Sequence, residues 1–329
     1  MGDRITLAHG NGGLLTHELV DVMKREFSNR ILDELADAAE MKVGKSRLAF
    51  STDSYVIKPL FFPGGDIGKL AVYGTVNDIS MKGARPLFLS LGFILEEGLG
   101  LDVLKRITRS VGLAAERSGV KIVTGDIKVV EKGAADGVFI NTAGIGVIER
   151  PGVSISGRAR PGDCIVINGT IAEHGMAVLN AREKLGFSSA IKSDCRNLNF
   201  VAERCLAVCG SIGCMRDLTR GGLATALNEI AAASNLGIEI DEKSVPVRRD
   251  VRALCDVLGF DPLYVANEGK FIAFAGEGDA RKVARAMGRP SAVIGRVTRA
   301  HRRQVYLRTR AGADRILPAL ETDQLPRIC

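Results

Sequence analysis

Apolar residues recur at helical spacing in two stretches of the first half of the chain. Four of them, from Leu19 to Ile31, lie as on one face of a helix, for which Thr16 is the predicted N-cap. A second helix is predicted over residues 104–115 and ends before Gly119. Short runs rich in β-branched residues predict strands at residues 46–54, 86–95, 120–126, 137–148 and 164–169.

The second half alternates between the same two periodicities. Helices are predicted at residues 174–184, at 200–208 and after Gly222, with strands at 237–241, 270–275, 291–297 and 304–309. Prolines and glycines gather in residues 150–162, where we expect a boundary. The pattern predicts an α+β, or mixed α/β, protein with domains at 1–150 and 151–315. Residues 316–329 lack periodicity and are predicted to form a flexible tail.

Composition narrows the class of protein. A hydrophobic fraction of 46% with 25% charged residues is that of a globular chain. No apolar run reaches the roughly 18 residues of a membrane span, and the N-terminus lacks an apolar signal segment, so a cytoplasmic protein without membrane contact is expected. The net charge is +7, but tryptophan is absent and aromatics are 5%, which predicts no nucleic-acid partner.

Four aspartates stand at predicted strand ends or beside glycines, where an isolated aspartate usually just forms a turn. Together they are a scattered set of carboxylates, the ligands that Mg²⁺ prefers, usually with phosphate oxygens completing its shell. The candidate metal ligands are Asp53, Asp78, Asp126 and Asp217.

Two glycine-rich segments precede predicted helices, and either one is suited to hold phosphate groups. Backbone N–H groups at a helix N-terminus bind anions, and glycine permits a close approach. Neither segment matches the common phosphate-loop or dinucleotide fingerprints, so two flexible turns remain the alternative. The residues concerned are Asn11, Gly12 and Gly13 in the first segment, and Gly221 and Gly222 in the second.

Cys329 stands apart from the other six cysteines because it is the last residue. A thiol at the end of a mobile tail can be modified by a partner and then inserted into a site elsewhere. Cys205, Cys209 and Cys214 have no CxxC spacing and no nearby histidine, so we expect them to pack as small hydrophobic residues. An odd number of cysteines in a large chain indicates reduced thiols.

Four segments together resemble the HypE family of hydrogenase maturation proteins, in the superfamily of aminoimidazole ribonucleotide synthetase and selenide water dikinase. They are ITLAHGNGGLLTHELV, NDISMKGARP, DLTRGGL and the terminal LPRIC. The resemblance runs essentially end to end, and the terminal cysteine is its most specific part.

The resemblance implies a two-domain fold and a homodimer whose N-terminal halves form a β-barrel. It implies ATP and Mg²⁺, bound by the aspartates and covered by the glycine-rich N-terminal segment. In the family, the carbamoyltransferase HypF loads a carbamoyl group on the terminal cysteine. The group is then dehydrated to a thiocyanate, and the cyanide passes to iron held by the HypC and HypD proteins, for the [NiFe]-hydrogenase centre.

This chemistry needs a base to remove protons from nitrogen and a cation near the oxygen that leaves. Glu268, followed by a glycine, is the candidate base, and Lys128 is the candidate cation. His9 or His17 is the alternative base. Two other readings remain: a superfamily enzyme that phosphorylates a free small molecule, and a thiol-rich metal carrier or scaffold without catalytic activity.

Overall fold

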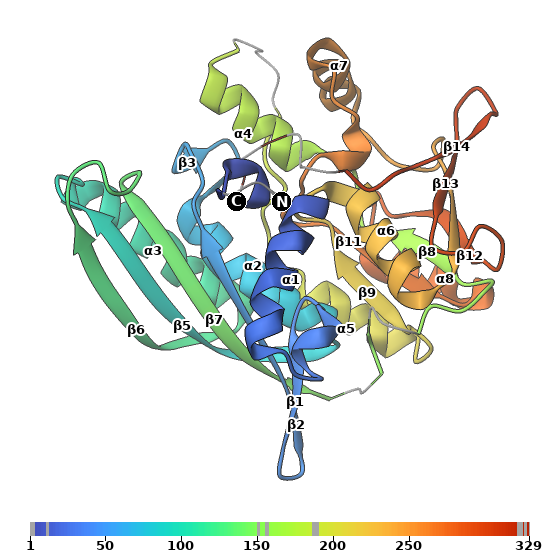
Figure 1. The fold of residues 1–329 in the computed structure, drawn as a ribbon, viewed down its shortest axis with the longest axis horizontal. Coiled ribbons are helices and arrows are strands. Elements are labelled where there is room, and N and C mark those ends of the chain that lie inside the picture. The colour runs from blue at the N-terminus through green and yellow to red at the C-terminus, as the bar shows by residue number, and fades with distance from the viewer. Residues whose placement is uncertain are drawn as a thin grey trace.

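The computed structural model describes residues 4–10, 13–149, 152–154, 158–185, 191–320, 325 and 328. They form a mixed α+β protein in which each half of the chain is built on its own β-sheet. In Figure 1 the sheet of the first half lies on the left and the second half on the right, with α2 between them. The predicted fold class is therefore confirmed.

The first half holds a five-stranded sheet in the order β1-β2-β7-β5-β6. Neighbouring strands are antiparallel except β5 and β6, which run parallel. The sheet is open, with β1 and β6 as its edges, and the described residues of one chain form no closed barrel. The strands are β1 (Ala39–Val43), β2 (Ser46–Tyr55), β5 (Ala84–Glu96), β6 (Lys121–Val130) and β7 (Val138–Ile148), with a small hairpin of β3 (Phe61–Phe62) and β4 (Gly65–Asp66).

The second half holds a seven-stranded sheet in the order β14-β13-β10-β12-β8-β11-β9. Its strands are β8 (Cys164–Ile167), β9 (Cys214–Asp217), β10 (Gly237–Asp241), β11 (Phe271–Ala275), β12 (Ala292–Thr298), β13 (Val305–Arg308) and β14 (Asp314–Ile316). Its helices are α4 (Glu173–Glu183), α5 (Asn199–Val208), α6 (Gly222–Ser234), α7 (Arg249–Leu258) and α8 (Glu277–Met287), with the 3-10 turn η3 (Pro262–Tyr264).

Helix α2 (Ile67–Met81) is the central element, because it contacts β2, β5 and β7 on one side and β9 and α5 of the second half on the other. Thirteen of its fifteen residues are buried. Asp66 caps it by accepting a hydrogen bond from the Lys69 amide at 3.0 Å. Gly146 of β7 allows the close approach: a Cβ atom there would lie 2.5 Å from Ile79 Cγ2.

The remaining helices of the first half show where the periodicity is informative and where it is not. The second predicted helix is confirmed as α3 (Leu101–Ser118), which ends at Gly119 with a φ of 68°. The first is α1 (Leu14–Phe27), so the predicted N-cap and end were wrong: Thr16 lies inside the helix and Ile31 beyond it. Helix α1 follows the 3-10 turn η1 (Leu7–Gly10), and a second turn, η2 (Leu32–Glu34), follows it.

The expected flexible tail is packed at the residues that the structure describes. Ile316 belongs to β14, and Leu317 is fully buried in the core of the second half. The Tyr264 hydroxyl donates to the Pro318 carbonyl at 2.7 Å, and the Leu14 amide donates to the Leu320 carbonyl at 3.1 Å. The chain after β14 is therefore held against both halves rather than free from residue 316.

None of the described helices has the length and apolar character needed to span a bilayer.

Gly146→Ala should destabilise the protein by about 1–3 kcal/mol, because the added methyl would also meet the Arg85 carbonyl oxygen at 2.8 Å, in a strand that cannot shift freely. Gly92→Ala in β5 is the matched control, since the nearest atom there lies 3.7 Å from the new Cβ. Urea denaturation compares the two variants with the wild type. Equal midpoints for all three would show that the close approach of α2 to β7 carries no such constraint.

Candidate active site

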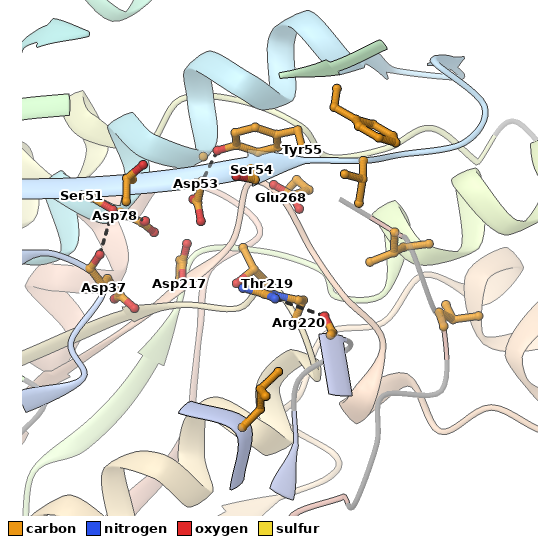
Figure 2. Close-up of a pocket in the computed structure, with 18 of the residues that line it drawn as sticks. Asp37, Ser51, Asp53, Ser54, Tyr55, Asp78, Asp217, Thr219, Arg220 and Glu268 are labelled. Atoms are coloured by element: carbon orange, nitrogen blue, oxygen red, sulfur yellow. Dashed lines mark hydrogen bonds between the residues drawn. The ribbon is translucent and has the colours of Figure 1, made fainter. Parts of the chain in front are cut away.

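A cavity of about 930 Å³ lies between the two halves. Its wall takes residues from η1, the loop before β1, strand β2, helix α2 and the segment after β9 (Figure 2). Polar side chains gather on one part of this wall, and Leu325 and Ile328 complete another. The polar residues include Asp37, Ser51, Asp53, Asp78, Arg216, Asp217, Thr219, Arg220 and Glu268.

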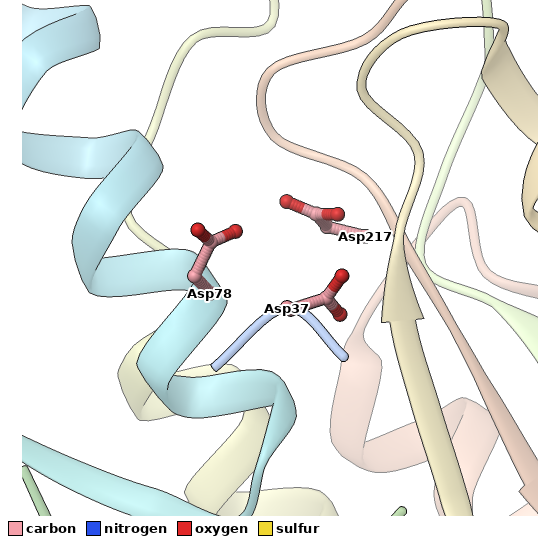
Figure 3. Close-up of side chains that lie close together, drawn as sticks. All are labelled: Asp37, Asp78 and Asp217. Atoms are coloured by element: carbon pink, nitrogen blue, oxygen red, sulfur yellow. The ribbon is translucent and has the colours of Figure 1, made fainter. Parts of the chain in front are cut away.

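Three of the carboxylates come together from distant parts of the chain. Asp37 precedes β1, Asp78 lies on α2 and Asp217 ends β9, and their side chains converge in Figure 3. One carboxylate oxygen of each lies within 4.8 Å of the others. Oδ2 of Asp37 and Oδ2 of Asp217 are buried without a hydrogen-bond partner among the described residues. Unpaired buried carboxylate oxygens at this separation fit a hard divalent cation such as Mg²⁺.

Burial makes this cluster costly to ionise. It raises the pKa of Asp78 and of Asp217 well above the usual range, and the neighbouring carboxylates raise it further. Burial also raises the pKa of Asp37 to about 6 and raises that of Asp53. The balancing charge is Arg216, which forms an ion pair with Asp37 and a second with Glu229. Without a cation, the folded chain therefore favours protonated carboxyls here.

The structure brings three of the aspartates named from the sequence, Asp53, Asp78 and Asp217, to the wall of one cavity, together with Asp37, which sequence reasoning missed. Asp53, on β2, accepts a hydrogen bond from the Tyr55 hydroxyl at 3.3 Å and lines the same cavity. Asp37 stands in the acidic run ILDELADAAE, with no glycine beside it, so the turn pattern that marked the others does not apply. Its hydrogen-bonding neighbour Ser51, which donates to Asp78 at 2.7 Å and to the Asp37 carbonyl at 3.0 Å, gives no local signal either.

Asp126 and Lys128 do not lie with this cluster in one chain. They are on β6, where their side chains are 70% and 68% exposed and form an ion pair of 2.6 Å. The cavity formed by the described residues of one chain includes neither of them. The expectation that Asp126 shares a site with the other aspartates is thus not met within a single chain.

Glu268 is 4% exposed and lines the cavity. Burial raises the pKa of its carboxyl well above the usual value, and the charges of Asp194 and Asp217 add to this. Neither alternative base lines the cavity that the described residues form. His9 is buried and its Nδ1 accepts from the Thr6 amide at 3.1 Å, while His17 Nε2 lies 3.6 Å from Glu229.

The two glycine-rich segments meet at one edge of the cavity. The Arg220 guanidinium donates to the Gly10 carbonyl at 3.3 Å, next to the first segment, of which Asn11 and Gly12 lie outside the described residues (Figure 2). Gly13 precedes α1 as its N-cap residue. Gly221 and Gly222 precede and begin α6 with φ values of 71° and 58°, a left-handed pair that other residues adopt only with strain.

Three internal cysteines, Cys205, Cys209 and Cys214, are buried, as expected for thiols that pack as small hydrophobic residues. Burial raises the pKa of Cys205 to about 12. Within the described ranges, the three aspartates above are the one group of histidine, cysteine or acidic side chains spaced to hold a metal. Cys329 lies outside the described residues, but its neighbour Ile328 is buried in the cavity wall.

Comparison with known proteins identifies the class. Models of the AIR synthase related proteins match residues 35–148 with the N-terminal domain and 160–308 with the C-terminal domain. The carbamoyl dehydratase HypE of Azotobacter vinelandii is 48% identical over 99% of this chain and 97% of its own length. The chain therefore belongs to the AIR synthase related family and, within it, to the HypE proteins.

Solved structures agree with this assignment. A HypE protein in complex with HypF has a TM-score of 0.87 and 45% identity, over 92% of this chain and 99% of that one. A HypE protein in complex with ATP has a TM-score of 0.84 and 49% identity, over 99% of this chain and all of the other. The resemblance to the HypE family that the four sequence segments indicated is thus confirmed.

Asp217→Asn should stabilise the metal-free protein relative to the wild type, increasingly so as the pH rises above about 4. A carboxyl whose folded pKa is raised contributes stability that is lost as the pH rises from the unfolded value, about 4, through the folded value. Mg²⁺ should raise the melting temperature of the wild type and do so much less in the variant. Thermal melts with and without Mg²⁺ test this, with Asp314→Asn, an exposed ion-pair residue of β14, as control. A Mg²⁺ response that survives in Asp217→Asn would contradict the metal site.

Proposed function

We propose that this chain uses ATP to dehydrate a carbamoyl group carried on its own Cys329 to a thiocyanate, which supplies the cyanide ligand for the iron of a [NiFe]-hydrogenase. One observation carries the proposal: the cavity that holds the carboxylate cluster and Glu268 is also lined by Ile328, the residue before Cys329. Relatives support it, since one is a carbamoyl dehydratase and another binds ATP.

The proposed reaction replaces a poor leaving group with a good one. The γ-phosphoryl group of ATP transfers to the carboxamide oxygen, which forms an O–P bond and releases ADP. Loss of the nitrogen protons then forms the C≡N bond as the C–O bond breaks and inorganic phosphate leaves. Such a transfer depends on positioning and charge neutralisation more than on covalent help from the protein.

Asp37, Asp78 and Asp217 would hold Mg²⁺ at the cavity wall, with Asp53 beside them. A bound Mg²⁺ neutralises the negative charge of the phosphate groups. The glycine-rich segments at Gly13 and Gly221 are suited to place backbone N–H groups against phosphate oxygens. The aspartates would thus bind the Mg²⁺ ion, and the glycine-rich segments would bind the phosphate groups of the same Mg²⁺–ATP complex.

Glu268 is the proposed base. Its raised pKa makes its carboxylate, once ionised, a stronger proton acceptor than a solvated one, which suits proton removal from a weakly acidic nitrogen. The backbone fixes its position, because its amide donates to Asp194 Oδ1 at 3.1 Å and its carbonyl accepts from Asn77 at 3.4 Å.

Strand β6 supports a homodimer. It is an edge strand, and nine of its ten residues are exposed, including Ile122, Val123 and Ile127. An exposed apolar edge strand offers unpaired backbone groups to which another chain can add. In the proposed dimer the two open sheets complete a barrel, and Asp126 and Lys128 of one subunit reach the cavity of the other. This would add a lysine to the arginines, Arg216 and Arg220, that already line the cavity of one chain.

The proposed partners follow from the family and from the chemistry of the tail. The carbamoyltransferase HypF would load Cys329, as the complex of a related HypE with HypF suggests. The HypC–HypD complex would accept the cyanide on its iron. We propose that these encounters take place in the cytoplasm, without a membrane or nucleic acid.

Cys329→Ala should abolish carbamoyl acceptance and thiocyanate formation while leaving ATP binding and the melting temperature near those of the wild type. The readouts are the mass of the C-terminal peptide after incubation with HypF, carbamoyl phosphate and ATP, and nucleotide binding by fluorescence. Cys164→Ala, at a half-buried thiol of β8, is the control. If ATP turnover persisted without Cys329, the chain would instead phosphorylate a free small molecule.

Glu268→Gln and Lys128→Ala should each slow dehydration of the loaded chain, the first by about 10²–10⁴. If Lys128 acts across the dimer, mixing the two variants creates one intact site per mixed dimer, because one subunit supplies Glu268 and the other Lys128. Subunit exchange should then restore about a quarter of wild-type activity. The rate of dehydration is measured as the loss of the mass of water from the carbamoylated C-terminal peptide. No recovery, with exchange verified, would place Lys128 outside the partner's site.

A further inference from the structure

His174 makes a contact that the proposed chemistry does not use. It lies in the first turn of α4, is fully buried, and places its ring Nε2 2.7 Å from the carbonyl oxygen of Ile328. That carbonyl belongs to the peptide group that joins Ile328 to Cys329. The same helical turn also contacts the tail at Gly175, where an added Cβ would lie 3.0 Å from Leu325 Cδ1.

The hydrogen bonds fix the tautomer of the His174 ring. A carbonyl oxygen only accepts, so Nε2 must carry the proton. Nδ1 then accepts from the Ser193 hydroxyl at 2.8 Å, and the Ser193 oxygen accepts from the Cys195 amide at 3.1 Å. Burial lowers the pKa of His174, which keeps the ring neutral. The donor and the acceptor of each hydrogen bond in this series are therefore defined.

The segment that orients His174 also holds Glu268. Between Ser193 and Cys195, the carboxylate of Asp194 accepts from the amides of Glu268 and Gly269, both at 3.1 Å. Lys270 Nζ lies 2.9 Å from Asp194, and although burial opposes it, this charge holds the pKa of Asp194 below its usual value. Lys270 Nζ also lies 3.2 Å from Glu173, the residue before His174.

We propose that His174 is a positioning residue that anchors the carbonyl before Cys329, and that residues 193–195 hold this anchor in register with Glu268. The part that concerns Glu268 rests on the proposed function; the anchor itself does not. A single neutral hydrogen bond shifts a docking equilibrium by only about two- to tenfold. The anchor thus allows the chain end to leave for loading by a partner and to return in one defined position.

The test measures how readily Cys329 reacts in the full-length reduced protein, without ATP or partner. Short exposures to N-ethylmaleimide are followed by mass spectrometry of the C-terminal peptide. His174→Phe keeps a buried ring but removes the donor, and leaving the Ile328 carbonyl unpaired should raise the Cys329 alkylation rate about fivefold or more. His174→Gln retains an N–H donor and should stay within about twofold of the wild type. Buried Cys195 and Cys214 are internal controls and should remain unreactive.

An unchanged Cys329 rate in a folded His174→Phe protein would overturn the anchor. If Cys195 and Cys214 also react, the fold has opened, and Leu325→Ala becomes the deciding variant. Leu325→Ala removes the packing of the tail against α4 and leaves the sequence of that helix unchanged. It should raise the rate of Cys329 alkylation, and an unchanged rate would overturn the proposal.

A second readout separates the anchor from the proposed function. In His174→Phe, carbamoyl loading by HypF should be equal to or faster than in the wild type, while dehydration should slow and the Gln variant should recover it. Equal dehydration by all three would overturn the link to Glu268. A wild type that is never dehydrated would refute the proposed function, whereas the alkylation result would still decide the anchor.

Discussion

The mutual repulsion of buried carboxylates is the constraint on which the rest of this structure depends. Asp37, Asp78 and Asp217 share a space in which ionisation is costly, and one arginine, Arg216, balances only part of their charge. Holding them there requires a rigid frame, and α2 supplies it by packing against both sheets along nearly its whole surface. Stability is thus given up at the site where a cation and phosphate groups are expected, as is usual where function opposes folding.

The proposed function places two opposed demands on the tail. The terminal thiol would have to be accessible to a partner for loading and also return to one position for the chemistry. The structure combines burial of the Leu325 and Ile328 side chains with a hydrogen bond from the buried ring of His174 to the Ile328 carbonyl. The buried ion pairs of Lys270 with Asp194 and Glu173 are rigid by comparison, because separating either pair inside the protein would leave a charge unpaired.

One dimer interface would account for two features of strand β6: its exposed edge, and the absence of Asp126 and Lys128 from the cavity of their own chain. Its apolar and charged side chains are exposed together, and the charged pair Asp126–Lys128 is far from the carboxylates of its own chain's cavity. A second copy would cover the edge and bring the pair to a cavity. The same interface would then contribute to stability and to catalysis, so the dimer and the activity would depend on each other.

The sequence alone predicted most strands, helix α3, the family and two of the three clustered aspartates, because these depend on local periodicity, strand ends or short motifs. It did not reveal α2, whose residues are apolar on nearly all sides and so lack a polar face. Asp37 and His174 likewise have no local signal. Their roles arise from contacts with residues 179 or 154 positions away, Arg216 in one case and Ile328 in the other. Only the tertiary structure brings such groups together, because the packing of two domains, and no pattern along the chain, sets those distances.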